Sequence, residues 1–428
     1  MIKFAIGVPT YNRAEMIEEM LIRCAELYQK EKIDVYFFDS SEDNQTEKIV
    51  NSYTLNYKNL YYQKVPSSIH SNIKVLNIYK EFSLKRKYHY LSICPDYMQF
   101  TEEGVQRIKI ECEKRFDICI LNFRDVENIG EKIYTDKNEI FFDCAWHMTS
   151  YMATIVNLNF LEDVDWGHIF KYYTIPEKVN FSHVALLFEQ LAKRNYIKAI
   201  HIPIFSKHIR ISSFRSNPYW KKDTFLIWCK YWPEMIYSLP NCYHKKNEVI
   251  RKHGINSKVL SLHNFIRLRK EKIYNINIYQ KYRLEWKNLT NVSKYLLKIL
   301  AVMPSQIVWM FSVNEWKQRT LRRKVTKFCK DNRDVYIYGC GFVARKTSDL
   351  LNSLNLKCQA YIVSDISNEK KTYNGVEVIS CQDFFSRTTK SGVIIALKKE
   401  NTKQVIQDKS RLVQYPLFLM WKYIDSLE

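Results

Sequence analysis

The chain opens with a short apolar run, a polar turn and a helical pattern, and this order constrains its fold most. The run from Phe4 to Val8 has the length and branched apolar content of a buried strand. Pro9 has no N–H to donate and predicts the end of the strand ladder, and a helical pattern begins near Glu15. In an open α/β sheet, ligands bind at the carboxyl edge, where polar side chains and N–H groups suit a nucleotide. The side chains predicted at this site are Pro9, Thr10, Tyr11, Asn12 and Arg13.

Two motifs in this part of the chain resemble those of a known enzyme family. Residues 8–13, Val-Pro-Thr-Tyr-Asn-Arg, read like the opening motif of nucleotide-sugar glycosyltransferases of the GT-A fold, the large second glycosyltransferase family. A strand-like run then ends at Asp39, where that family has an acidic residue that holds the nucleoside. The family usually shows Asp-x-Ser-x-Asp-x-Thr there, which Asp39, Ser41, Asp43 and Thr46 approximate. The resemblance covers residues 1–210.

This resemblance implies a reaction and its partners. A sugar would move with inversion from a nucleotide diphosphate donor, with a UDP-sugar favoured, to a glycan or polyprenyl-diphosphate-linked acceptor in surface polysaccharide biosynthesis. Thr10, Tyr11 and Asn12 would hold the nucleoside together with Asp39.

Leu60-Tyr61-Tyr62 predicts a short third strand. The next strand-like run, residues 88–94, is followed by Pro95 and Asp96. Related transferases place their Asp-x-Asp metal motif here, and the resemblance implies a Mn²⁺ or Mg²⁺ ion at Asp96 that bridges the two phosphates. The motif departs from the family pattern, because Asp96 is its only carboxylate. The alternative for Asp96 is an ordinary turn-capping aspartate.

Three basic residues are candidates for the donor: Lys74 for a phosphate or the base, and Arg210 and Arg215 for the diphosphate. Lys74 lies on a helix predicted over residues 73–82, after a polar loop. Arg210 and Arg215 lie in a Ser-rich loop with Lys207 and His208, and arginine binds phosphate with two parallel hydrogen bonds. The alternative for all three is a solvated cation.

The acceptor side of the site is predicted from an aromatic segment. Trp146, His147 and Tyr151 are candidates to stack on or hydrogen-bond a sugar, and plain packing is the alternative. An inverting transfer needs one base near the acceptor hydroxyl. His183 and Asp143 are the first candidates for this base, with Asp163 and Asp165 as further ones, and a buried structural histidine is the alternative for His183.

The composition of the chain limits the classes of binding partner that are expected. The 66 Lys and Arg against 45 Asp and Glu leave a net charge of +21, which favours polyanionic partners. Without a recognition helix, zinc-finger spacing or RNA-binding aromatic signature, no nucleic acid partner is predicted. The 11 cysteines show no metal or redox spacing, and Met1 leads straight into the first strand, so a cytoplasmic protein is expected. The apolar residues 295–311 predict a buried helix pair or a peripheral membrane contact.

A second glycine-turn pattern occurs near the carboxyl terminus. A strand from Asp334 leads into Gly339-Cys-Gly341-Phe-Val-Ala, a helix, and a second strand that ends before Asp365. This order matches the dinucleotide-type βαβ fingerprint and resembles the small Rossmann-like modules of sugar acyltransferases and some polysaccharide-building transferases. Gly339, Gly341 and Asp365 would be its ligand contacts, while a docking, sensing or oligomerising module is the favoured interpretation.

The predicted fold class is α/β, in three parts. Residues 1–216 form a GT-A nucleotide-sugar domain, residues 217–330 a helical, aromatic-rich and basic region, and residues 331–428 a small Rossmann-like βαβ domain. The predicted activity is glycosyl transfer. The alternatives are a nicotinamide-dependent sugar-modifying enzyme that works through the last domain and a non-catalytic glycan-binding scaffold. Self-association is left open.

Overall fold

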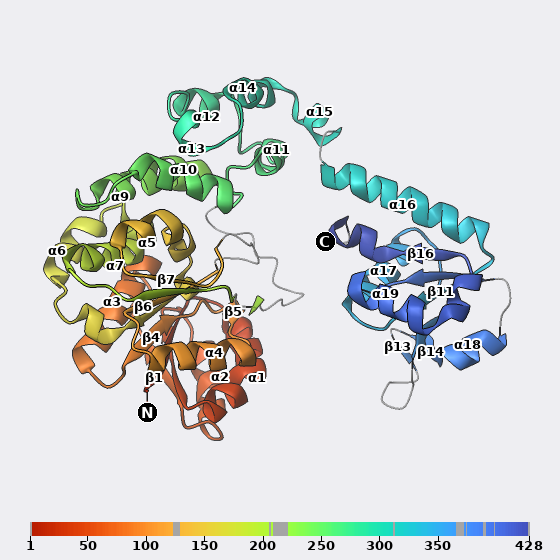
Figure 1. The fold of residues 1–428 in the computed structure, drawn as a ribbon, viewed down its shortest axis with the longest axis horizontal. Coiled ribbons are helices and arrows are strands. Elements are labelled where there is room, and N and C mark those ends of the chain that lie inside the picture. Colours follow the sequence, from red (N-terminus) through yellow and green to blue (C-terminus); the bar gives the residue numbers. More distant parts are fainter. Residues whose placement is uncertain are drawn as a thin grey trace. The chain divides into compact units, whose positions relative to one another are not determined.

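The computed structural model describes residues 2–122, 129–204, 207–208, 221–310, 313–364, 372–373, 375–387, 391–397 and 399–426. The predicted residues Arg210, Arg215 and Asp365 lie outside these ranges. The chain divides into two compact units, shown in Figure 1. Unit 1 comprises Met1–Phe265 and Ile273–Val302, and unit 2 comprises Ile266–Lys272 and Met303–Glu428. The predicted α/β class is confirmed, and the three-part division remains a prediction.

Unit 1 is built on an eight-stranded sheet with the order β3-β2-β1-β4-β8-β6-β9-β7. Its strands are β1 Phe4–Thr10, β2 Ile33–Asp39, β3 Leu60–Lys64, β4 Tyr90–Ile93, β6 Ile118–Leu121, β7 Lys132–Tyr134, β8 Thr154–Asn157 and β9 Ala199–Ile202. A separate pair is formed by β5 Met98–Gln99 and β10 Lys207–His208. The strands β3, β2, β1 and β4 run parallel, so their carboxyl ends meet at one edge.

Strand β8 runs against its neighbours. It pairs antiparallel with both β4 and β6. Its amino-terminal end, Thr154, therefore lies at the edge where β4 and β6 end. The segment that precedes β8 is thereby brought to the edge predicted to bind a nucleotide.

The expectation that Pro9 ends the strand ladder is wrong for the pairing of β1 with β2. Strand β1 pairs with β4 only as far as Gly7, but it pairs with β2 through Pro9 to Thr10 and Asp39. Alternate residues of a strand direct their backbone groups to opposite neighbours. The Thr10 carbonyl accepts the Ser40 N–H, so Thr10 faces β2 and Pro9 faces the side that β4 has already left.

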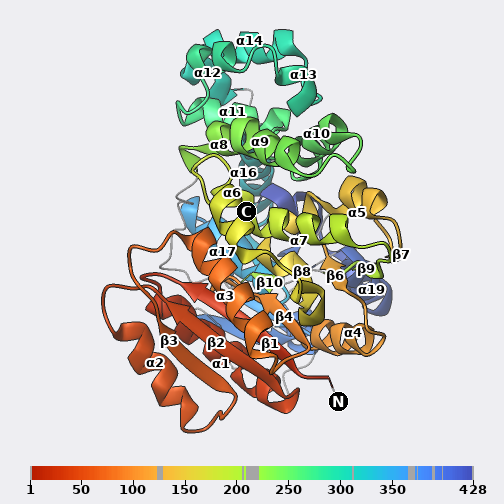
Figure 2. The same cartoon turned by 90° about the vertical axis from the view of Figure 1, so that its left-hand side faces the viewer.

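Helices cover both faces of this sheet (Figures 1 and 2). On one face, α1, α2 and α4 bury apolar side chains against alternate residues of β1, such as Phe4, Ile6 and Val8. On the other face, α3 packs over Gly7, and α7 lies beside α3. The helices are α1 Ala14–Lys30, α2 Gln45–Thr54, α3 Ser71–Lys85, α4 Glu102–Glu113, α5 Lys137–Cys144, α6 Trp166–Tyr173 and α7 Ser182–Lys193.

A helical region follows, as the aromatic-rich sequence predicts. Its helices are α8 Thr224–Leu226, α9 Trp232–Ser238, α10 Lys246–Asn256, α11 Leu262–Lys270, α12 Ile276–Lys281, α13 Trp286–Leu289 and α14 Lys294–Val302. The apolar segment 295–311 is interrupted, because α14 ends at Val302 and the next helix begins at Ser305. Helix α14 buries Leu297 and Leu300 and exposes Tyr295 and Ile299. Within the described ranges, no helix has the length and apolar character needed to cross a bilayer.

Unit 2 is a smaller α/β sandwich with the strand order β13-β14-β12-β11-β15-β16. Five of its strands, β14, β12, β11, β15 and β16, are mutually parallel, and helices pack on both faces. Its elements are α15 Ser305–Met310, α16 Val313–Asp331, β11 Asp334–Tyr338, α17 Phe342–Ser353, β12 Ala360–Val363, β13 Thr372–Tyr373, β14 Val376–Ser380, α18 Cys381–Arg387, β15 Ser391–Ile395, α19 Lys399–Asp408 and β16 Leu417–Leu419.

Gly7 sets how closely α3 approaches the sheet of unit 1. A Cβ at this position would lie 2.9 Å from Cγ2 of Ile78 on α3 and 3.3 Å from Cδ1 of Ile93 on β4. We expect Gly7→Val to lower the free energy of unfolding by about 1–3 kcal/mol, because overpacking forces the helix and sheet apart. Urea unfolding measures this change. Gly130→Ala is the control, since a Cβ there meets no atom within 4 Å, and equal stability of the two variants would contradict the packing argument.

Candidate active site

The loops that follow β1 and β2 are bonded to each other. Asn12 has a φ of 50°, a left-handed conformation that asparagine adopts more readily than most residues. Its N–H donates to Ser41 Oγ at 2.8 Å, and its side-chain Oδ1 accepts the Glu42 N–H at 3.3 Å. The two predicted donor motifs therefore form one continuous rim at the carboxyl edge of the sheet.

Asp39 is fully buried beneath this rim. Its Oδ1 accepts the Ser41 N–H at 2.8 Å and also contacts the Ser41 hydroxyl. Its Oδ2 accepts the Tyr62 hydroxyl at 3.0 Å and lies 3.7 Å from Lys64 Nζ. Burial and the Asp39 carboxylate both raise the Tyr62 pKa well above its usual value, so the phenol stays protonated as a donor. In this structure Asp39 fixes the loop that carries Ser41.

The side chain of Lys74 connects the loop that follows β1 to the loop that follows β2. This residue lies in α3, and its side chain is buried. Its Nζ donates to the Thr10 carbonyl at 2.7 Å and to Ser40 Oγ at 2.6 Å. Burial lowers the Lys74 pKa to about 8, although the nearby Asp39 and Asp96 carboxylates oppose the shift. The predicted phosphate-side lysine is thus a buried cation at the centre of the site.

Asp96 lies at the end of β4 and is 3% exposed. Its Oδ2 accepts the Thr10 hydroxyl at 2.9 Å, and its Oδ1 accepts Arg13 Nη1 at 2.8 Å. The Arg13 side chain is 31% exposed and lies 5.9 Å from the centre of the Tyr97 ring. Burial raises the Asp96 pKa, while Arg13, Thr10 and Lys74 act against this rise.

The donor set at Asp96 does not fit a divalent cation. Mn²⁺ and Mg²⁺ take several oxygen ligands, usually from more than one carboxylate or from carboxylate and phosphate together. Here the one carboxylate of the motif has both oxygens bonded, one to a guanidinium and one to a hydroxyl. Across the described ranges, no group of three or more His, Cys, Asp and Glu side chains is placed to hold a metal ion.

The predicted acceptor residues divide into buried and accessible ones. Trp146 and His147 are 1% and 0% exposed, so neither presents a face to a sugar in this structure. Tyr151 is partly buried, and its hydroxyl donates to Asn72 Oδ1 at the start of α3. This bond brings Tyr151 from the segment before β8 to the helix that carries Lys74.

The two first candidates for the base lie in different places. His183 is buried with its ring 4.6 Å from that of Tyr151, and its Nε2 lies 3.2 Å from the Met148 carbonyl. Burial lowers the His183 pKa to about 4, so the imidazole is neutral at pH 7.

Asp143 is held by Lys252 and Lys132, at 3.1 and 3.2 Å. Burial would raise its pKa, but the two lysines outweigh that effect and lower it. Lys132 begins β7, five strand positions from β1, or about 24 Å at 4.8 Å a strand. The structure therefore does not bring Asp143 together with the donor residues.

Three contributors were not predicted from the sequence. Tyr62, Ser40 and Asn72 hold Asp39, Lys74 and Tyr151 respectively. Tyr62 lies on β3, next to β2, and the pairing of Phe37 with Tyr62 places it beside the end of β2. The sequence signal for this placement is only the apolar run that predicts β3.

The glycine turn of unit 2 has the expected backbone. Gly339 has a φ of 108°, which side chains rarely allow, and a Cβ there would lie 2.9 Å from Leu397 Cδ2. Gly341 directly precedes α17, so the glycines lie at the carboxyl end of β11 between β12 and β15. This is the crevice at which doubly wound sheets bind ligands.

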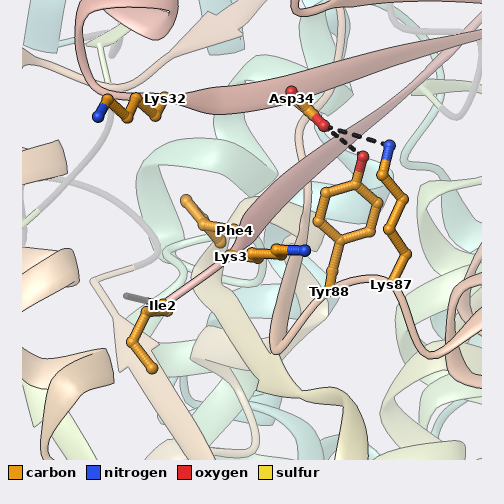
Figure 3. A pocket seen from close by; sticks show the side chains of 7 residues that line it. All are labelled: Ile2, Lys3, Phe4, Lys32, Asp34, Lys87 and Tyr88. Atoms are coloured by element: carbon orange, nitrogen blue, oxygen red, sulfur yellow. Dashed lines mark hydrogen bonds and ion pairs between the residues drawn. The ribbon is translucent and has the colours of Figure 1, made fainter.

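A shallow cavity lies at the opposite edge of the unit 1 sheet. Figure 3 shows its lining by Phe4, Lys32, Asp34, Lys87 and Tyr88. Asp34 accepts the Tyr88 hydroxyl and pairs with Lys87 at 3.5 Å. Since Phe4 and Asp34 belong to the amino-terminal ends of β1 and β2, this cavity is separate from the Thr10–Asp39 rim.

The fold was compared with known proteins. No protein-family model and no curated protein sequence matches the chain. Solved structures that match include residues 1–349 of TarS from S. aureus, at a TM-score of 0.37 and 14% identity, covering 75% of this chain and 82% of that one. Another is the mannosyltransferase PcManGT from Pyrobaculum calidifontis in complex with GDP-Man and Mn²⁺, at a TM-score of 0.39 and 15% identity, covering 70% and 86%.

Likeness at this level assigns no activity. The α/β sheet of unit 1 and its two motifs, at the ends of β1 and β2, agree with the GT-A-like fold that the sequence resemblance implies.

The lowered pKa of Lys74 predicts a pH dependence of stability. The folded state loses the Lys74 proton near pH 8, whereas an unfolded lysine keeps it to about 10.5. The unfolded state therefore binds more protons between these values, and stability rises with pH there. Relative to Lys74→Met, we expect the wild type to gain up to about 3 kcal/mol across this window.

Urea unfolding of both proteins below and above pH 8 measures this difference. Lys48→Met, at an exposed position of α2, is the control and should show no such trend. A difference between wild type and Lys74→Met that stays constant with pH would contradict the burial argument.

Proposed function

We propose that the chain is a glycosyltransferase that uses a nucleotide diphosphate sugar, with a UDP-sugar as the favoured donor. The observation that supports this most is the buried Lys74 beneath the joined loops of Thr10 and Ser40. A lysine buried against two neutral acceptors sets a positive potential at the carboxyl edge of a sheet, where phosphate groups bind in α/β folds.

The nucleoside would lie along the rim formed by residues 10–13 and 40–43. Tyr11 is 46% exposed and offers an aromatic face to a base. Asn12 and Ser41 hold the rim in shape, and Asp39 fixes the Ser41 loop from below. Arg13 would meet the diphosphate, since a guanidinium donates parallel hydrogen bonds to phosphate oxygens.

The reaction would be a single displacement with inversion. The acceptor hydroxyl oxygen attacks the anomeric carbon and forms the new C–O bond. The bond from that carbon to the diphosphate oxygen breaks, its electron pair stays with the nucleoside diphosphate, and the hydroxyl proton passes to a base. Neither of the two first candidates for this base is open to an acceptor in this structure, since His183 is 1% exposed and Asp143 is paired with Lys132 and Lys252.

The acceptor would be a glycan or a lipid-linked glycan, approached by Tyr151. The net charge of +21 favours a phosphate-bearing acceptor or contact with an anionic membrane surface, consistent with surface polysaccharide biosynthesis. The C-terminal unit would serve as a docking or ligand-sensing module around Gly339 and Gly341.

A donor panel tests the proposed activity. Release of free nucleoside diphosphate from UDP-, GDP- and CDP-sugars is measured with and without a glycan acceptor. We expect turnover with one nucleotide class. Failure of every donor both to turn over and to shift the thermal unfolding temperature would refute the proposal.

The Thr10 hydroxyl provides a sharper test within the site. Thr10→Val keeps the shape of the side chain but removes the hydrogen bond to Asp96. We expect donor affinity to fall about tenfold, because the Asp96 carboxylate loses a donor and shifts. Thr54→Val is the matched control, since the Thr54 hydroxyl donates to the Asn51 carbonyl on the surface of α2, away from the rim. Unchanged donor affinity in Thr10→Val would place the donor elsewhere.

A further inference from the structure

We infer that a nucleoside diphosphate binds the carboxyl edge of unit 1 without a divalent cation, with Arg13, held by Asp96, in the cation's place. This inference rests on the proposed function and concerns how the same site meets the diphosphate charge.

The first support is the state of the Asp96 carboxylate. A metal motif keeps its carboxylate oxygens directed at the ion. Asp96 instead gives Oδ1 to Arg13 and Oδ2 to Thr10, in a setting that is 3% exposed. A cation at Asp96 would lie next to the Arg13 guanidinium and would have to displace it, against the repulsion of two positive charges.

The second support is the geometry of Arg13. Its side chain is held at Asp96 yet is 31% exposed, so it is fixed by a buried anchor and reaches the solvent side of the rim. Fixed guanidinium groups bind phosphate with directed, charge-assisted hydrogen bonds. Asp96 is then a positioning residue that acts through Arg13.

The third support is Lys74. Its Nζ donates to two neutral oxygens, and no described carboxylate lies within 4.0 Å of it. Its charge is therefore not cancelled by a contact ion pair within the part of the chain that the structure describes. When the sugar leaves, the nucleoside diphosphate gains one negative charge, and a fixed, poorly hydrated cation stabilises that charge with little reorganisation.

The inference assigns a different task to each side chain. Arg13 contacts the diphosphate, and Asp96 orients Arg13. The buried Lys74 supplies a positive electrostatic potential beneath the loops of Thr10 and Ser40. It also explains why one carboxylate stands where the related family has two. A second carboxylate would compete for Arg13 and weaken its contact with phosphate.

Binding in the presence of a chelator tests the inference. The full chain is treated with EDTA and titrated calorimetrically with UDP, GDP and CDP, and then again with Mn²⁺ or Mg²⁺ added. We expect one diphosphate to bind in EDTA and its affinity to change by less than about threefold with metal, since no metal contact is gained. Binding that requires the metal would overturn the inference and leave the proposed function standing. Absence of binding under every condition would refute the proposed function itself.

Substitution of Arg13, compared with substitution of a control arginine, separates phosphate recognition from folding. In EDTA, Arg13→Gln should bind the diphosphate about tenfold or more weakly but bind the matching nucleoside within about threefold of wild type. Arg23→Gln, which breaks the exposed Arg23–Glu19 pair on α1, the helix that begins after Arg13, is the matched control and should bind both ligands normally. Equal loss of diphosphate and nucleoside affinity in Arg13→Gln would overturn the assignment.

Asp96→Asn tests the positioning role. In EDTA the wild type should bind the diphosphate about tenfold more tightly than this variant, because the guanidinium loses its charged anchor. Metal should not widen the difference. Equal affinities in EDTA, with a gap that opens only when Mn²⁺ is added, would show that Asp96 is a metal ligand and would overturn the inference.

Discussion

The two hydrogen bonds from Lys74 Nζ to the Thr10 carbonyl and Ser40 Oγ hold the site together. They join the ends of β1 and β2 to α3, and Gly7 allows α3 to lie close enough for the side chain to reach. This contact is unfavourable for an isolated lysine, because burial lowers its pKa to about 8. A buried lysine at this edge of the sheet is understandable as part of a site for an anion, in keeping with the pattern that perturbed groups gather where chemistry occurs.

The sequence predicted the order of elements well and the contacts among side chains poorly. Strand runs that end before Pro9, at Asp39 and near Asp96 were recognisable because apolar periodicity reports burial and parallel strands share an edge. The contact between Arg13 and Asp96 spans 83 positions and depends on rotamers, which no local pattern encodes. Likewise, Trp146 and His147 have the composition of a sugar-binding segment but lie wholly inside the core. Strand β1 continues through Pro9 because only β2 pairs with it there. Strand β4 has already ended, so no partner needs the N–H that Pro9 lacks.

Asp39 and Asp96 show how similar carboxylates acquire different tasks. Asp39 is held by the Ser41 N–H and the Tyr62 hydroxyl, so its carboxylate fixes the conformation of the loop that carries Ser41. Asp96 is held by one hydroxyl and one partly exposed guanidinium, and its pKa is raised by burial. The first carboxylate is fully buried, whereas the second holds a cation that reaches the solvent side.

The reversed direction of β8 divides the carboxyl edge of the sheet into two halves. Because β8 begins at the edge where β4 and β6 end, the segment before β8, which carries Tyr151, lies at that edge. The residues around Thr10 and Asp39 belong to a separate stretch with its own internal bonds. A change ahead of β8 would therefore act first on one half of the edge, and the bond from Tyr151 to Asn72 is the contact through which it would reach the half that carries Thr10 and Asp39.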